Sequence, residues 1–182
     1  YRWGNPQNYN RGNDNNQILY APHGANWIQL GFIGEGNILI FNNGVGRPGG
    51  NYSSVIEIEL PIDEEGNYFI DSILQFQPEL PHWEYVKEFD LYSNIQSGAF
   101  RLENGNTLIT VTQQDLILEV NNEGEIIWQY NYMGNGHIAR AMHYELNFLY
   151  GDINFDNTVD INDIIILINF ILEINQFNIN IQ

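Results

Sequence analysis

The sequence predicts an all-β protein with a short calcium-binding loop and helix at its C-terminal end. Three observations lead to this prediction. Short runs of residues that favour β-strands, separated by Gly and Asn, fill residues 1–148. An internal repeat is present within that stretch. After Gly151, acidic residues alternate with other residues, as in a calcium loop. No window of about 11 residues in 1–148 has helical periodicity. We therefore divide the chain into a β-rich part, residues 1–148, and a loop-helix part, residues 151–182.

The β-rich part contains nine runs that we expect to be strands. Each is rich in β-branched and aromatic residues and is bounded by residues that favour turns. The runs are 17–20, 26–30, 37–41, 52–60, 68–76, 98–102, 107–112, 115–120 and 125–130.

The internal repeat groups these strands in fours. The matching pairs are GNILI (36–40) with GNTLI (105–109), VIEIE (55–59) with ILEVN (117–121), and EEGNYFI (64–70) with NEGEIIW (122–128). Each copy thus has four strands with a Glu-Gly turn before the last, which is the composition of one β-propeller blade. A β-sandwich or an open sheet is the rival architecture.

The first residues suggest that a further blade precedes these two. Tyr1-Arg2-Trp3 resembles Trp128-Gln129-Tyr130 at the end of the second copy. We therefore expect the chain to hold about two to three blades. Because a closed ring needs about four to eight, we expect the remaining blades to lie upstream in a longer protein.

Composition excludes several classes of function. Twenty-three acidic residues against six Lys and Arg give a formal net charge of −17, which argues against a nucleic-acid partner. The Ile-rich segment 161–172 is too short to span a membrane and is interrupted by Asn162, Asp163 and Asn169. The chain has no Cys, so it has no disulfides, no thiolate metal sites and no cysteine nucleophile.

The acidic stretch GDINFDNTVDIND has the spacing of a calcium loop. Its oxygen donors at loop positions 1, 3, 5, 7, 9 and 12 are Asp152, Asn154, Asp156, the Thr158 carbonyl, Asp160 and Asp163. Asn157, at position 6, tolerates the left-handed conformation that the sharp turn needs. Residues 161–172 are expected to form the helix that follows. An acidic turn without a metal is the alternative.

Residues 151 to about 173 resemble one calcium repeat of a type I dockerin, an extracellular docking module. Dockerins carry two such repeats, and residues 173–182 contain no second acidic loop. The resemblance implies a cohesin-like or cell-surface partner. Calcium loops of extracellular modules bind at about 10⁻⁴ to 10⁻³ M, which favours a periplasmic, cell-surface or secreted location.

His23 and Ser97 are the candidate polar residues of the β-rich part. His23 stands directly before the first strand of the first copy, and the repeat lays Ser97 over it. In a propeller the ends of first strands line the central funnel, so both residues would face it. The alternative is that His23 is an ordinary surface histidine whose ring bonds a neighbouring group and has no catalytic role. Among the cations, we expect Arg2, Arg11, Arg101 and Arg140 to be surface charges or blade-edge ion pairs.

Six motifs together resemble the C-terminal half of the aryl-sulfate sulfotransferases, a bacterial β-propeller family. They are WGNPQNYNRG, LYAPHGANWI, GNILIFNNGVGRP, NYSSVIEIELP, FDLYSNIQSGAFRLENGNTLI and ILEVNNEGEIIWQY, in order over residues 1 to about 145. The resemblance implies a six-bladed ring. It also implies transfer of a sulfuryl group from a phenolic sulfate ester to a phenolic acceptor, through a sulfohistidine and without a nucleotide sulfate donor.

Residue by residue, the resemblance makes His23 the nucleophile, in the motif Pro22-His23-Gly24. Ser97 falls in a segment that, in the family, supplies hydroxyl groups near the nucleophile. Arg47 belongs to the family motif F-[DN]-N-G-x-G-R, which implies a position close to the same site. The family's other site residues come from upstream blades, so we expect this chain to be inactive by itself. Asn42 stands where the family often has Asp. The alternative functions are a non-catalytic extracellular propeller used for binding or scaffolding, and a hydrolase that passes sulfate to water.

Overall fold

A computed structural model describes residues 1–68, 75–87, 90–144 and 149–172 of the chain. The chain divides into two compact units, Tyr1–His143 and Tyr144–Gln182. Among the described residues, the first unit is built from strands and short 3₁₀ turns, and the second contains one α-helix. The all-β prediction is confirmed at this level.

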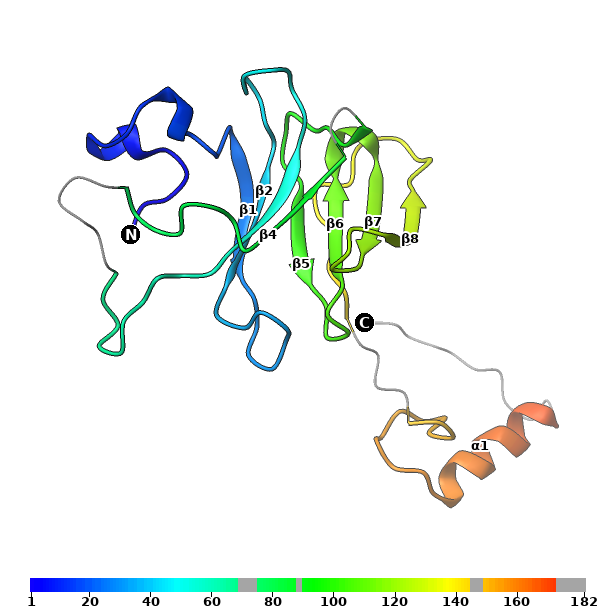
Figure 1. Cartoon of the computed structure of the whole chain (residues 1–182). Helices are drawn as coiled ribbons and strands as arrows, with labels where there is room; N and C mark the ends of the chain where they lie inside the picture. Colours follow the sequence, from blue (N-terminus) through cyan, green and yellow to red (C-terminus); the bar gives the residue numbers. More distant parts are fainter. Residues whose placement is uncertain (69–74, 88–89, 145–148, 173–182) are drawn as a thin grey trace. The chain divides into compact units, whose positions relative to one another are not determined.

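The first unit contains two four-stranded antiparallel sheets, each a meander in chain order (Figure 1). The first sheet consists of β1 (Pro22–Trp27), β2 (Ile38–Asn42), β3 (Ser54–Ile58) and β4 (Trp83–Val86). The second sheet consists of β5 (Gly98–Arg101), β6 (Thr107–Val111), β7 (Leu116–Val120) and β8 (Ile126–Asn131). The division into two groups of four strands agrees with the internal repeat.

The alternation of side chains along β2 explains how the sheets pack. Successive residues of a strand point to opposite faces. Leu39 and Phe41 are fully buried in one core cluster with Ile109 and Val120 of the second sheet. Ile40 belongs to a separate cluster on the other face, the outer face of the first sheet. The two sheets therefore pack face to face through a shared apolar core.

The prediction for the fourth strand of the first sheet is wrong. The sequence repeat placed it at 68–76, of which 69–74 lie outside the described residues, whereas the strand that pairs with β3 is β4. The predicted Glu-Gly turn does form, since Asp63 Oδ1 accepts the N–H groups of Glu65 and Asn67. It closes a small hairpin joined by an Ile62–Tyr68 bridge. The predicted turn is thus confirmed, whereas the predicted position of the strand after it is wrong.

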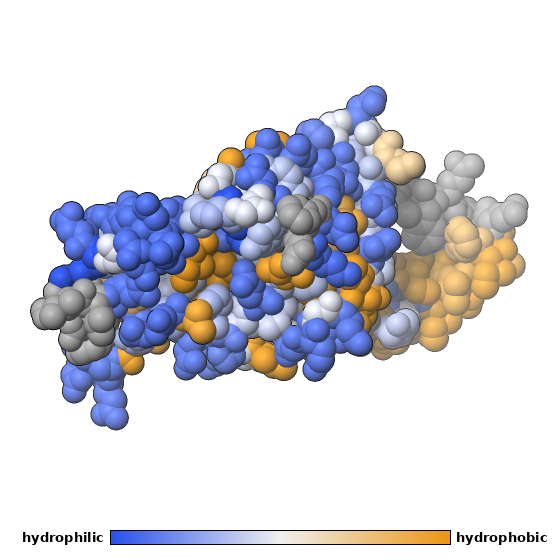
Figure 2. All heavy atoms as spheres, turned by 45° about the horizontal axis from the view of Figure 1, so that its top comes forward, coloured by the Kyte–Doolittle hydropathy of each residue, from blue (hydrophilic) through white to orange (hydrophobic). Residues whose placement is uncertain are grey.

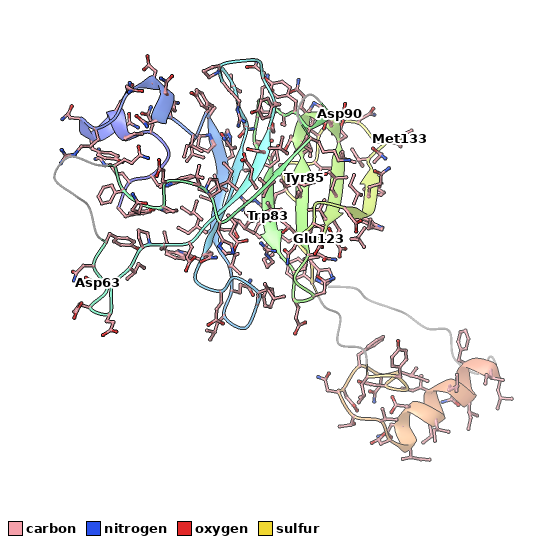
Figure 3. The ribbon with its side chains drawn as sticks, viewed as in Figure 1. Asp63, Trp83, Tyr85, Asp90, Glu123 and Met133 are labelled. Carbon is pink, nitrogen blue, oxygen red and sulfur yellow. The ribbon has the colours of Figure 1, made fainter. Side chains whose placement is uncertain are left out.

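Two aromatic residues of β4, Trp83 and Tyr85, explain why this strand pairs with β3 in place of the predicted one. Both are labelled in Figure 3. Tyr85 is 3% exposed and belongs to the core between the sheets, with Trp83 packed against the same core. The Trp83 indole also donates a hydrogen bond of 2.8 Å to the Asn122 carbonyl of the second sheet's last turn. Aromatic burial between two sheets outweighs a local sequence match.

The N-terminal segment does not contain the strand predicted at 17–20, and residues 1–3 form no strand either. Trp3 and Leu19 instead pack on the cluster at the outer face of the first sheet. Gly4 holds the segment together, because its carbonyl accepts N–H groups from Ile18 and Leu19. This segment therefore covers the outer face of the first sheet. Since two sheets do not close a ring, the propeller stays a prediction.

The second unit contains helix α1 (Ile161–Ile171). The Asp160 side chain accepts the Asn162 N–H, and the Asp163 side chain accepts the Asp160 N–H, which together make a capping box. The predicted helix is thus confirmed and begins at the expected residue. Within the part of the chain that the structure describes, no helix has the length and apolar character needed to cross a bilayer.

Candidate functional site

The imidazole of His23 lies near the start of β1, on the face directed toward the second sheet. His23 is paired in register with Phe41, whose side chain is in the core between the sheets. The ring itself is exposed to solvent, and its Nδ1 lies 2.8 Å from Oδ1 of Asn43. No hydrogen bond to its Nε2 is found among the described residues.

Asn43 fixes which nitrogen of His23 carries the proton. Asn43 is fully buried, and its Nδ2 donates to the carbonyls of Ser93 at 2.8 Å and Gln96 at 3.2 Å. Carbonyls can only accept hydrogen bonds, so the amide cannot be turned around, and Oδ1 must face His23. Nδ1 of His23 therefore donates. In the neutral ring this leaves the lone pair on Nε2, the nitrogen open to solvent.

Gly24 brings His23 close to Ser97. A Cβ atom added to Gly24 would lie 3.0 Å from Gly98 Cα and 3.1 Å from the Ser97 carbonyl oxygen, and Gly24 has a φ of +63°. Only glycine allows this approach between β1 and β5 without strain. Nearby, the Asn26 amide donates to the Ala99 carbonyl at 2.8 Å. The first strands of the two sheets thus lie side by side, as the repeat predicted.

The Ser97 hydroxyl is committed to the protein interior. Ser97 is 2% exposed, and its Oγ accepts the Thr112 N–H at 3.0 Å while lying 3.1 Å from the Ile95 carbonyl. Gln96 and Ser97 are consecutive non-glycine residues with φ values of 42° and 76°. Such conformations cost about 1–3 kcal/mol each and are concentrated at functional sites. If Ser97 contacts a ligand at His23, it can do so only through its backbone atoms, because its hydroxyl is buried.

Arg47 is directed to the opposite face of the first sheet from His23. Its Nη2 lies 3.4 Å from Oγ of Ser54, which is paired in register with Asn42 and Val86, on the outer face. Its guanidinium lies over the Tyr52 ring, 3.9 Å from the ring centre. The structure therefore brings His23 and the Ser97 segment together and leaves Arg47 apart from them.

Asn43 is the site residue that the sequence did not single out. Its neighbour Asn42 points to the other face, where its amide accepts the Tyr20 N–H and donates to the Ile18 carbonyl, so Asn42 secures the N-terminal segment. The available signal was the two-residue period of β2, because Asn43 shares the face of Phe41 and hence of His23.

Arg101, expected at the surface or in a blade-edge ion pair, is a buried link between the sheets. Its Nη2 bonds Glu57 Oε2, and the two side chains are 2% and 4% exposed. Nη1 donates to Gly105 O and to Asn122 Oδ1, and Glu57 Oε1 accepts the Asn37 amide at 2.6 Å. Burial lowers the pKa of Arg101, and the charge of Glu57 opposes that shift.

The acidic loop of the second unit is organised by its own carboxylates. Asp152 accepts the N–H groups of Asp156 and Asn157, and Asp156 accepts both the N–H and the hydroxyl of Thr158. Asn157 has a φ of 65°, the left-handed conformation expected at loop position 6. Asp163 accepts the N–H groups of Asp160, Ile153 and Asn154, which tie the loop to the helix.

The donor set of this loop fits Ca²⁺ by its chemistry. Among the described residues, no three His, Asp or Glu side chains are gathered into a group that could hold a metal. Ligation would therefore have to include the Asn154 amide and the Thr158 carbonyl, and such mixed oxygen ligands are those that calcium loops use. Asp160 and Asp163 already serve the capping box, so Asp152, Asn154 and Asp156 are the main candidates.

Acidification is expected to reduce the helicity of the second unit. Backbone hydrogen bonds, first that from Asp160 and then those from Ile153 and Asn154, hold the pKa of Asp163 below its usual range. A lowered folded-state pKa stabilises the fold above the unfolded value of about 3.9, and this contribution is lost as the pH falls through the lower folded value. Helical circular dichroism measured from pH 6 to pH 2 tests this.

Asp163→Asn is the matched variant for that titration. It should be less helical than the wild type at pH 6, because a neutral amide is a weaker acceptor at a helix N-terminus. Its helical signal should also change less between pH 6 and pH 2, because the variant has no carboxylate at position 163 to be protonated. Identical acid transitions in the two proteins would show that Asp163 does not hold the loop.

The fold and site define an all-β protein with two face-to-face meanders, an oriented exposed histidine where they meet, and an acidic loop-helix. Comparison with protein families, with curated proteins and with solved structures finds no match for the chain. The two family resemblances therefore rest on the sequence motifs alone.

Proposed function

We propose that this chain is part of an aryl-sulfate sulfotransferase in which Nε2 of His23 is the nucleophile. The observation that carries the proposal is the hydrogen bond from His23 Nδ1 to the locked amide of Asn43. A nucleophile held in position by a second side chain, with its reactive atom toward solvent, is the arrangement that covalent catalysis needs. The substrate class comes from the family resemblance.

The reaction proceeds in two displacements at sulfur. The lone pair of His23 Nε2 attacks the sulfur of a phenolic sulfate ester and forms an N–S bond. The S–O bond to the ring breaks, its electron pair stays on the phenolate oxygen, and that oxygen takes up a proton from solvent. The oxygen of a second phenol then attacks sulfur, the N–S bond breaks, and its electrons return to Nε2 while the acceptor's proton leaves. No electron is gained or lost overall.

Asn43 supports both displacements. It keeps Nδ1 protonated, so attack through Nε2 produces a ring with positive charge beside the Asn43 carbonyl oxygen. The amide is not basic enough to remove the Nδ1 proton, which therefore stays on the ring through the cycle. The ring returns to its starting tautomer when the sulfuryl group leaves.

The arrangement of the sheets is the basis for proposing a propeller. Meanders of four strands that pack face to face, with first strands side by side, are what neighbouring blades look like. We propose that further blades in the complete protein close the ring and supply the cations for the sulfate oxygens.

The rival function is that of a non-catalytic propeller used for binding or as a scaffold. Incubating the complete protein with a phenolic sulfate donor, without acceptor, distinguishes the two functions. If the protein is a sulfotransferase, mass spectrometry should find one sulfuryl group on His23.

We also propose that the 152–163 loop binds Ca²⁺ and that the loop-helix docks the protein outside the cytoplasm. The helix supports a docking role because apolar side chains cover much of its surface (Figure 2). The exposed fractions of Ile161, Ile164 and Ile171 are 64%, 52% and 66%. A cohesin-like or cell-surface protein is the partner that the resemblance implies.

Calcium added after chelator treatment is expected to increase helicity and release heat, with half-saturation at about 10⁻⁴ to 10⁻³ M. The Asp152→Ala, Asp156→Ala double variant should lose both responses, because it removes two of the three main candidate side-chain ligands. Asp63→Ala, in the hairpin of the first unit, is the matched control and should respond as the wild type does. If the double variant and the wild type respond alike at millimolar Ca²⁺, the loop is not a calcium site.

A further inference from the structure

An open cleft of about 400 Å³ lies on the outer face of the first sheet. Its walls come from the N-terminal segment 14–20, the loop that contains Arg47 and Tyr52, and the outward side chains Glu84 and Val86 of β4. The volume is in the range of pockets that hold small molecules. All of these residues belong to the first unit.

Arg47 brings a positive charge to this cleft. The chain has 23 acidic residues, yet none of those that the structure describes forms an ion pair with Arg47. The single hydrogen bond found for its guanidinium among the described residues is the long one, 3.4 Å, to Ser54 Oγ. A planar guanidinium with unused terminal N–H groups is suited to bind an oxyanion through two parallel bonds.

The walls around Arg47 are suited to a ring. Tyr20 and Tyr52 line the cleft together with Pro48 and Val86. The Arg47 guanidinium carbon already lies over the face of Tyr52, 3.9 Å from the ring centre, and this contact restricts the side chain before any ligand arrives. A preset cation next to aromatic and apolar surface favours a flat ligand that joins a ring to an anionic group.

The carboxylates of the cleft limit the charge that a ligand can carry. Asp14 and Glu84 also line it, so two carboxylates accompany the one arginine. Those carboxylates repel a dianion about twice as strongly as a monoanion, and they can accept hydrogen bonds from a ligand hydroxyl. We infer that this cleft is a binding site for a small aryl monoanion, an aryl carboxylate or an aryl sulfate ester, with its oxyanion on Arg47.

This site is separate from the proposed nucleophile. His23 shares the face of Phe41, toward the second sheet, whereas Ser54 and Val86 of the cleft lie on the outer face. The inference needs no sulfuryl transfer. A protein whose His23 proves unreactive would still bind the anion.

Titrations of the chain with 4-hydroxybenzoate, phenyl sulfate, phenol and inorganic sulfate, followed by calorimetry and by NMR shifts of Tyr20, test the site. At least one of the two aryl monoanions should bind more tightly than phenol and inorganic sulfate. Arg47→Met should weaken that binding about tenfold or more, because it removes a charge-assisted bond. Arg140→Met is the matched control, since its guanidinium also lies over a ring, that of Phe100 at 5.6 Å, but outside the cleft.

Glu84→Gln provides a test with the opposite sign, at an exposed position where the fold should tolerate it. Removing a like charge from the cleft should strengthen binding about two- to fivefold. The inference is overturned if neither aryl monoanion binds by 10 mM, if inorganic sulfate binds as well as they do, or if Glu84→Gln leaves the affinity unchanged. Equal loss of binding in Arg47→Met and Arg140→Met would overturn it as well.

Discussion

His23→Asn in the complete protein is expected to abolish both sulfuryl transfer and the sulfated enzyme intermediate. Asparagine keeps a polar side chain at the exposed position but has no nucleophilic nitrogen. The wild type should show ping-pong kinetics and should accumulate a sulfohistidine when donor is given without acceptor. The variant should show neither, while its melting temperature stays close to that of the wild type because the ring is outside the core.

His82→Asn is the matched control for that experiment. His82 is also an exposed histidine, 3.7 Å from Glu59, and no side-chain amide of the described residues bonds its ring. It should retain both the intermediate and the transfer activity. A His23→Asn variant that still transfers sulfate, or an active wild type in which His23 never carries a sulfuryl group, would remove His23 from the mechanism.

Arg101→Met is expected to destabilise the first unit by about 3–5 kcal/mol, because it leaves the buried carboxylate of Glu57 without its cation. The loss is measured as a lower urea midpoint in equilibrium unfolding. The double variant Arg101→Met, Glu57→Leu removes both charges and should recover much of the stability, since an apolar pair can replace a buried ion pair at little cost.

The two variants together separate an ion-pair effect from a packing effect. If the double variant is as unstable as Arg101→Met, the loss comes from the packing of the long arginine side chain over Trp83, whose ring centre is 5.5 Å from the guanidinium carbon. If Arg101→Met costs less than about 1 kcal/mol, the buried pair does not hold the sheets together.

The strands of the second sheet could be predicted from sequence because their determinants are local. Residues 107–112 and 115–120 have β-branched side chains between turn residues, and the observed strands begin and end within about one residue of those limits. The fourth strand of the first sheet could not be predicted in this way. Its place depends on Trp83 and Tyr85 meeting the second sheet, and that contact links positions far apart in the sequence.

The same distinction applies to the candidate site. The repeat placed His23 and Ser97 at equivalent strand ends, and the structure brings those segments together. The two-residue period of β2 could place Asn43 on the face of His23, but not show that its amide is locked, because its other partners, Ser93 and Gln96, belong to the approach to the second sheet. It also could not indicate that Arg47 faces away, since the direction of a loop side chain depends on the strands around it.

The hydrogen bonds of Asn43 also determine when during folding the His23 ring becomes oriented. Its amide is held by carbonyls some fifty residues further along the chain, at separations of 50 and 53. Before the second sheet docks, that amide is free to rotate, and the imidazole exchanges its proton between both nitrogens as any solvated histidine does. A chain still being made therefore carries an unoriented histidine at this position, and the ring is fixed only when the two sheets of the first unit have met.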